Sequence, residues 1–282
     1  MFRSLLFIPG NNPSMLQNAD VFLADAIIFD LEDAISINEK NNARNLVKNY
    51  LLTSSVLPKQ IILRVNSINT EWFKKDIELL KTNKINYLLI PKTDKSSLLN
   101  IEEYLSAFEK ENKLVETKII ALVETARGVN DLPLFAENKR LIALLLGAED
   151  LASDLQIKRT ETGEEIFYAR SKIIYAAVDH NLIAIDTPYT NINNLEGLLK
   201  DATYAANLGM KAKACIHPNQ LEVVNKVFSP SEQEIKWAKE VIKISLEKPG
   251  SGAFQFQGKM IDKPILDRAE KILVKAKHFN LM

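Results

Sequence analysis

The chain has 282 residues, of which 46% are hydrophobic, and its 36 Lys and Arg balance 36 Asp and Glu. This is the composition of an ordinary globular protein. The zero formal charge argues against nucleic acid or an anionic membrane as the main partner, since both attract a basic surplus. The single cysteine, Cys215, cannot form an internal disulfide, and the apolar run Leu5–Pro9 is too short for a signal peptide or membrane span. We therefore expect a cytoplasmic protein.

Short apolar runs alternate with longer amphipathic stretches along most of the chain, a pattern typical of strands and helices in turn. The predicted strands are Ser4–Ile8, Ala26–Phe29, Ile61–Val65, Tyr87–Ile90, Lys118–Val123, Leu141–Leu146, Leu182–Ile185 and Lys213–Ile216. The predicted helices between them include Asn38–Tyr50, Glu71–Lys81, Ser97–Glu111, Glu164–His180 and Asn194–Leu208.

Continuously apolar strands that alternate with helices predict a parallel sheet covered by helices. Eight such units favour an α/β fold of the closed (β/α)₈ TIM-barrel type, with an open doubly wound sheet as the alternative. After the eighth run, two helices are predicted at Ser231–Leu246 and Asp262–Lys277, separated by the turn-rich segment KPGSGAFQFQGKM. We assign residues 1–228 to a barrel catalytic domain and residues 229–282 to a C-terminal helical extension or lid.

Barrel enzymes carry their chemistry at the C-terminal ends of the strands, and here most strands end in charged residues. Glu124 and Asp150 follow the fifth and sixth predicted strands, which are neighbours in a barrel. Two carboxylates with open positions for water and substrate suit Mg²⁺, whereas the three histidines and Cys215 are not spaced as zinc ligands. The alternative is that such carboxylates cap the following helices, as Asp150 could.

Other charged side chains near strand ends have two interpretations each. Arg64, inside the apolar run ILRVN, either binds a substrate oxygen or pairs with Asp30 or Glu32. Lys92 is interpreted as a solvated loop lysine rather than a Schiff-base nucleophile. We expect Cys215 to be inert and His217 to hydrogen-bond to the backbone.

Asp262, just before Pro264 and a helical pattern, is by sequence logic the N-cap of that helix.

Motifs spread over almost the whole chain resemble those of the citrate lyase β-subunit (citryl-CoA lyase) family. These motifs are RSLLFIPGNNPSM, AIIFDLEDAIS, ILRVNS, IPKTD, VETARG, LLGAEDLASDL, KRTETGEEIFYAR, KACIHPNQ and GAFQFQGKMIDKP. The family belongs to a broader group of Mg²⁺-dependent barrel lyases and aldolases that includes malyl-CoA and citramalyl-CoA lyases. Its members usually form trimers or dimers of trimers, so the resemblance implies a homo-oligomer.

The resemblance implies a role for each matching residue. Glu124 and Asp150 would be the Mg²⁺ ligands. Arg64 would bind the substrate next to its thioester carbonyl, and Ala148 and Glu149 would hold the substrate carboxylate. Asp262 would reach a neighbouring subunit's site as the acid/base, so the extension would pack on that neighbour. The acids that would line the site around the metal are Asp30, Glu32 and Asp33.

The leading hypothesis is a Mg²⁺-dependent carbon–carbon lyase that cleaves a β-hydroxyacyl thioester, of the citryl-CoA type, by a retro-Claisen step. The alternative substrates are citramalyl-CoA or malyl-CoA, with or without thioester hydrolysis. The thioester would be carried by CoA or by an acyl carrier protein, and citrate lyase carrier and transferase subunits are further expected partners. A hypothesis of another class is a non-catalytic subunit that binds acyl-CoA or a carrier protein.

Overall fold

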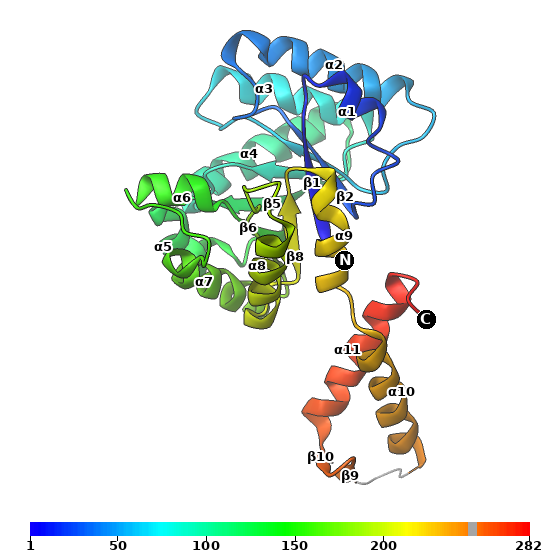
Figure 1. Cartoon of the computed structure of the whole chain (residues 1–282). Helices are drawn as coiled ribbons and strands as arrows, with labels where there is room; N and C mark the ends of the chain where they lie inside the picture. Colours follow the sequence, from blue (N-terminus) through cyan, green and yellow to red (C-terminus); the bar gives the residue numbers. More distant parts are fainter. Residues whose placement is uncertain (248–252) are drawn as a thin grey trace. The chain divides into compact units, whose positions relative to one another are not determined.

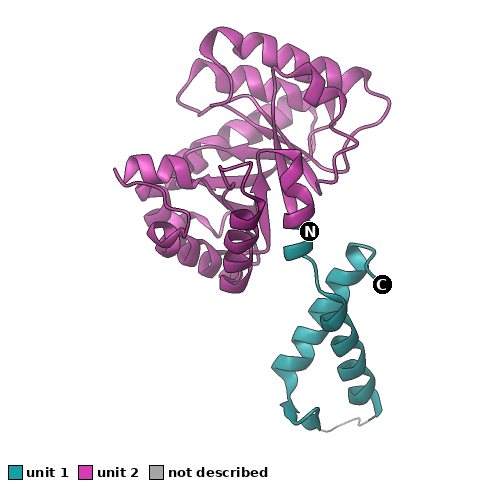
Figure 2. Ribbon diagram, in the orientation of Figure 1, with its two compact units in different colours: residues 1, 225–282 teal, residues 2–224 magenta. Residues whose placement is uncertain are grey.

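A computed structural model describes residues 1–247 and 253–282 and divides the chain into two compact units. One unit spans Phe2–Val224, and the other comprises Met1 and Asn225–Met282 (Figure 2). The helix α9 (Leu221–Val227) contains the boundary. No helix among the described residues is long and apolar enough to cross a membrane.

The unit Phe2–Val224 is a (β/α)₈ barrel, as the sequence predicts. Within it, parallel strands β1 to β8 follow one another in chain order, and β8 pairs with β1 to close the barrel. The sequence prediction names eight strands, and three of them, β4, β5 and β6, have the predicted bounds. The strands are β1 (Ser4–Pro9), β2 (Ala26–Asp30), β3 (Ile61–Arg64), β4 (Tyr87–Ile90), β5 (Lys118–Val123), β6 (Leu141–Leu146), β7 (Ile183–Asp186) and β8 (Ala212–Cys215).

Helices surround the strands on the outside of the barrel (Figure 1). The longest barrel helix, α4, begins at a reciprocal capping box in which Asp94 and Ser97 satisfy each other's backbone N–H groups. The barrel helices are α1 (Pro13–Gln17), α2 (Lys40–Thr53), α3 (Glu71–Ile77), α4 (Lys95–Asn112), α5 (Ala126–Phe135), α6 (Ala148–Asp154), α7 (Phe167–Asp179) and α8 (Leu195–Leu208). Short 3₁₀ turns at Ile37–Glu39, Glu78–Thr82, Glu164–Ile166 and Pro218–Gln220 complete the connections.

Alternate residues of each strand fill the barrel interior, because successive side chains of a strand point to opposite faces. The interior cluster includes Leu5, Ile28, Ile62, Leu122 and Leu145, all at most 2% exposed. Residues two positions further along the same strands or just past their ends therefore face the mouth of the barrel. This alternation determines which strand-end residues reach the candidate site.

The unit containing residues 225–282 is a helical hairpin with a small sheet. The helices α10 (Glu232–Glu247) and α11 (Lys263–His278) pack on each other around buried Ala238, Val241 and Ala269. Between them, β9 (Phe254–Phe256) and β10 (Lys259–Ile261) form an antiparallel pair. The turn between these strands has positive φ at Gln257 and Gly258, as a two-residue hairpin turn requires.

The sequence analysis expects only a turn-rich segment where this β-hairpin lies. The first part of that segment, residues 248–252, lies outside the described residues.

Candidate active site

A pocket of about 350 Å³ opens at the C-terminal ends of the barrel strands, where barrel enzymes hold their substrates. Its floor consists of Phe7, Leu122 and Leu145, which belong to the barrel core or pack against it. Its polar lining includes Asp30, Arg64, Glu124, Glu149, Asp150 and Thr187. Asp30, Arg64, Glu124 and Asp150 therefore meet in one cavity, whereas Glu32 and Asp33 do not belong to its lining.

Arg64 is held in place by Asp30 on the neighbouring strand. Its Nε and Nη2 donate to the two carboxylate oxygens of Asp30 over 2.7 and 2.6 Å. The third nitrogen, Nη1, lies 3.2 Å from Oε2 of Glu32 and 4.0 Å from Oδ2 of Asp33. The guanidinium carbon also lies 5.1 Å from the centre of the Phe7 ring. The two interpretations of Arg64 are thus compatible, because it pairs with Asp30 and lines the pocket as well.

Glu124 is an almost fully buried carboxylate at the end of β5, 1% exposed. Its Oε1 accepts the backbone N–H of Lys92 over 2.8 Å. Burial, and then the negative charges of Glu32 and Asp150, raise the pKa of Glu124 to about 8. The site therefore carries more negative charge than its own cations offset.

The residues after β6 lie beside Glu124 in the same pocket. Gly147 is the N-cap of α6, and Asp150 lies in the first turn of that helix rather than capping it. The Ala148 N–H donates to Thr187 Oγ1 over 3.2 Å. The carboxylate of Glu149 accepts from Nε of Arg159 over 2.9 Å.

The donor set fits Mg²⁺. Among residues 1–247 and 253–282, no group of three or more His, Cys, Asp or Glu side chains is arranged to hold a metal. The pair of Glu124, directly after β5, and Asp150, in the first turn of α6, would leave coordination positions for water and substrate, as Mg²⁺ prefers. Burial, followed by the charges of Glu32 and Asp150, raises the pKa of Glu124, and a bound cation would favour its ionised form.

Glu32 is the most perturbed of the surrounding acids. Burial raises its pKa to about 7, although the positive charge of Arg64 opposes the shift. Lys40 donates to the backbone oxygens of Leu31 and Glu32 over 2.9 and 2.6 Å, which fixes the loop after β2. Asp33 has a half-exposed side chain.

Three other residues considered in the sequence analysis have the non-catalytic surroundings expected of them. Cys215 is fully buried in β8, and burial raises the pKa of its thiol to about 12. His217 Nδ1 accepts the backbone N–H of Asn219 over 3.2 Å, as expected. Lys92 has a half-exposed side chain 3.9 Å from Glu32.

Asp262 belongs to the unit of residues 225–282 and is the N-cap of α11. Its Oδ1 accepts the backbone N–H of Ile265 over 3.4 Å.

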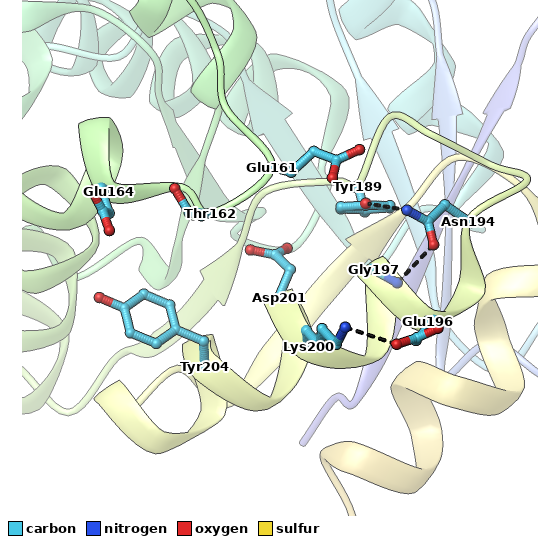
Figure 3. A pocket seen from close by; sticks show the side chains of 10 residues that line it. All are labelled: Glu161, Thr162, Glu164, Tyr189, Asn194, Glu196, Gly197, Lys200, Asp201 and Tyr204. Atoms are coloured by element: carbon cyan, nitrogen blue, oxygen red, sulfur yellow. Dashed lines mark hydrogen bonds and ion pairs between the residues drawn. The ribbon is translucent and has the colours of Figure 1, made fainter.

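A second pocket, of about 530 Å³, lies between the segment before α7 and the first turns of α8 (Figure 3). Its charged lining is mostly acidic, with Glu161, Glu164 and Asp201. The lysine in it, Lys200, forms an ion pair with Glu196 over 2.7 Å. Such a surface repels phosphate groups, so this pocket does not suit the diphosphate of a CoA ligand.

Two residues of the site, Gly147 and Thr187, lie at predicted strand ends but have no role assigned from the sequence. A Cβ at position 147 would lie 2.6 Å from both Cβ and Oε2 of Glu124, so glycine allows β6 to approach this carboxylate. Thr187 follows β7 directly and lines the pocket. The sequence indicates Thr187 only by its position between Asp186 and Pro188 at a strand end. It does not reveal which residue Thr187 contacts.

Comparisons with known proteins agree with this geometry. Residues 3–218 match the family model described as HpcH/HpaI aldolase/citrate lyase. The chain is 36% identical over 277 residues to the citrate lyase subunit beta of Leuconostoc mesenteroides subsp. cremoris, covering 96% of this chain and 92% of the relative. It is 34% identical to a (3S)-malyl-CoA thioesterase of Cereibacter sphaeroides, covering 98% and 94% of the two chains.

The structure resembles CitE from Mycobacterium tuberculosis, crystallised with magnesium, acetoacetate and coenzyme A. The TM-score is 0.80 and the identity 31%, and the match covers 97% of each chain. With its closed barrel and the match over residues 3–218, the chain belongs to the HpcH/HpaI aldolase/citrate lyase family and is a carbon–carbon lyase.

Proposed function

We propose that this lyase depends on Mg²⁺ and cleaves a β-hydroxyacyl thioester, of the citryl-CoA type, into an acetyl thioester and a 2-oxo acid. The observation that carries the proposal is the meeting of the buried Glu124 with Asp150 and Arg64 in one pocket at the mouth of the barrel. Relatives support both halves of it, since CitE was crystallised with magnesium and coenzyme A and a citrate lyase subunit is 36% identical.

The retro-Claisen step breaks the bond between the α- and β-carbons of the acyl group. The β-hydroxyl loses its proton, its oxygen becomes the carbonyl of the 2-oxo acid, and the bonding electrons pass to the α-carbon. The resulting enolate of the acetyl thioester then takes up a proton. Mg²⁺ held by Glu124 and Asp150 would supply Lewis-acid polarisation of the substrate hydroxyl and carboxylate.

Arg64 is the residue that we assign to the developing enolate. Asp30 fixes its guanidinium through two hydrogen bonds, so its orientation requires no reorganisation as charge develops. Glu32 and Asp33 lie beside Arg64, at 3.2 and 4.0 Å from its Nη1. We assign them to orienting metal-bound water, and Ala148 and Glu149 to the substrate carboxylate.

Asp262 is our candidate for the acid/base that removes the hydroxyl proton. It is a half-buried side chain at the start of α11, in the unit that we propose to be a lid. The helical hairpin has only a small core of its own, so it gains stability by packing on a larger surface. We propose that this surface belongs to a neighbouring copy in a homotrimer and that the lid completes the neighbour's site.

The test is acetyl-CoA release from citryl-, citramalyl- and malyl-CoA, each assayed with Mg²⁺ and with EDTA. We expect rapid cleavage of one thioester that stops in EDTA. Cleavage that persists in EDTA would contradict the metal role. If no thioester is cleaved by the folded oligomer, a carrier-linked thioester is the next substrate to test, and failure there would favour a non-catalytic acyl-binding subunit.

A second candidate function is cleavage of malyl-CoA or citramalyl-CoA combined with hydrolysis of the thioester. It is favoured by the 34% identity to a (3S)-malyl-CoA thioesterase over 277 residues. The same assay separates the two functions when free thiol is measured along with acetyl-CoA, because only hydrolysis releases CoA thiol.

A further inference from the structure

Strand alternation sends neighbouring residues around the end of β7 in opposite directions. Ile185 belongs to the barrel interior cluster, as do Ala212 and Ala214 of β8. Asp186 and Lys213 therefore point outward, toward the helices. Thr187, one residue beyond Asp186, points inward again and lines the substrate pocket.

The outward side chains form a buried ion network with two surrounding helices. Arg170 of α7 donates to both oxygens of Asp186 over 2.9 and 3.0 Å and to Asp201 of α8 over 2.6 Å. Lys213 donates to the same two carboxylates, over 2.6 Å in each case. The Arg170, Asp186 and Lys213 side chains are fully buried, and that of Asp201 is nearly so.

Such a network is expensive to desolvate, and an apolar replacement is often at least as stable. Its presence therefore points to a positional role. Asp201 also lines the second pocket (Figure 3).

Thr187 is held from three sides. Lys213 Nζ donates to its backbone oxygen over 2.7 Å, so the network holds the turn after β7 directly. Its Oγ1 accepts the Ala148 N–H over 3.2 Å. Pro188 follows it in sequence and confines its backbone to extended conformations. Thr187 is also 1% exposed. Its backbone and side chain therefore have little freedom to move.

The Thr187 hydroxyl is placed to donate its proton into the pocket. Because Oγ1 already accepts a backbone N–H, the O–H bond must point away from Ala148. Among the described residues, 1–247 and 253–282, the Thr187 hydroxyl accepts this one hydrogen bond and donates none. A buried hydroxyl normally has a partner, and the remaining side of this one is the cavity shared with Glu124 and Asp150.

We propose that Thr187 is a substrate-binding residue that donates its hydroxyl proton to the carboxylate of the acyl substrate, and that Lys213 is its positioning residue. The acceptor is a carboxylate because Thr187 contacts Ala148, which the proposed function assigns to the substrate carboxylate. This inference rests on the proposed function and extends it, since it assigns a neutral hydrogen-bond donor to the substrate carboxylate.

The first experiment compares Thr187→Val with Thr187→Ser in the full-length protein with Mg²⁺. Valine keeps the shape of threonine and removes the hydroxyl, whereas serine keeps the hydroxyl. We expect Val to raise KM for the cleaved thioester, and Kd for pyruvate in calorimetry, by about 10- to 100-fold, the cost of a lost hydrogen bond to a charged group. We expect Ser to recover most of that loss.

Thr203→Val is the matched control, because the exposed Thr203 donates its hydroxyl to the Leu199 backbone oxygen on the outer helix α8. It should leave KM and Kd unchanged. If Thr187→Val does not fold, as judged by circular dichroism, Thr187→Ala replaces it. Unchanged KM and Kd in the hydroxyl-free variant would overturn the proposal, as would a Ser variant as weak as Val.

The positioning role of Lys213 has its own test. Lys213→Met should lower kcat/KM through KM, and in the Thr187→Val background it should cause no further loss, because the two residues act through one contact. If the Met variant does not fold, Lys213→Gln retains a donor for the Thr187 carbonyl. Additive losses would contradict the positioning role.

The pyruvate measurement separates this inference from the proposed function. If the wild type cleaves no thioester but binds pyruvate in a Thr187-dependent manner, the proposed reaction fails and the binding role stands. If cleavage occurs and the Thr187 variants match the wild type, the proposed reaction stands and the binding role of Thr187 fails.

Discussion

Arg64 and Asp30 form a two-pronged ion pair across neighbouring strands, with Nε to Oδ1 at 2.7 Å and Nη2 to Oδ2 at 2.6 Å. Only a planar guanidinium can make both bonds and still present a third nitrogen to the pocket. Asp30 is 2% exposed, so the pair is largely shielded from water, and it fixes the residue that we assign to the thioester oxygen.

Replacement of Arg64 by Lys should therefore abolish most activity although the charge is kept. We expect kcat/KM for the cleaved thioester to fall by about 100-fold or more, the typical effect of losing an oxyanion donor. The matched control is Arg127→Lys, since Arg127 is exposed on α5 and lies 3.9 Å from Asp131. Arg64→Lys activity within threefold of the control would show that the forked geometry is dispensable.

Glu124→Gln should stabilise the metal-free protein at alkaline pH. The pKa of Glu124 is raised in the fold to about 8 from an ordinary 4.5, so the folded state binds more protons than the unfolded state between these values. Its contribution to stability is therefore present below pH 4.5 and is lost as pH rises through about 8, at about 1.4 kcal/mol for each unit of pKa difference. Glutamine is neutral throughout and should lack this slope.

Urea unfolding in EDTA from pH 5 to 8.5 measures that difference. Added Mg²⁺ should then raise the melting temperature of the wild type and leave Glu124→Gln unchanged. Parallel pH profiles for the two proteins, or an equal Mg²⁺ shift in both, would contradict the assignment of Glu124 as an electrostatically strained metal ligand.

Asp262 should act in a neighbouring subunit, and mixing two inactive variants tests this. Arg64→Ala inactivates the barrel site, and Asp262→Asn inactivates the lid. Co-expression of the two should restore about a quarter of wild-type activity, because in a cyclic oligomer one junction in four pairs an intact barrel with an intact lid. Size-exclusion chromatography provides the control for assembly, and no recovery in mixed oligomers would place Asp262 in its own subunit's site or outside catalysis.

Cys215 should not react in the native protein. Burial raises the pKa of its thiol to about 12, and the residue is 0% exposed in β8. Iodoacetamide at pH 8 should label it only in denaturant, because both the thiolate and access to it require opening of the barrel. Mass spectrometry of the single cysteine gives the labelled fraction, and stoichiometric labelling within minutes under native conditions would contradict the buried placement.

The barrel could be predicted from sequence because parallel strands covered on both faces are continuously apolar. Runs such as Lys118–Val123 and Leu141–Leu146 keep their predicted bounds in the structure. The helix α5 was not predicted, because it contains Pro133 and spans only ten residues, so its periodicity is weak.

The charged strand ends were also visible in the sequence, but their partners were not. Arg170 pairs with Asp186 and Asp201, which are 16 and 31 residues further along the chain, and no local pattern records such contacts. The hydrogen bond from Ala148 to Thr187 spans 39 residues and depends on where two separate loops turn. Strand positions follow from local periodicity, whereas the pairing of side chains depends on the closed barrel.

The opposite orientation of Asp186 and Thr187 places a limit on how this chain can change in length. Deletion or insertion of a single residue within β7 would exchange the two side chains, turning the carboxylate toward the substrate pocket and the hydroxyl toward Arg170 and Lys213. The substrate pocket would then gain a negative charge, and Arg170 and Lys213 would lose the carboxylate that they share. A residue added in the stretch between Pro188 and α8 (Leu195–Leu208), by contrast, leaves the alternation of β7 intact.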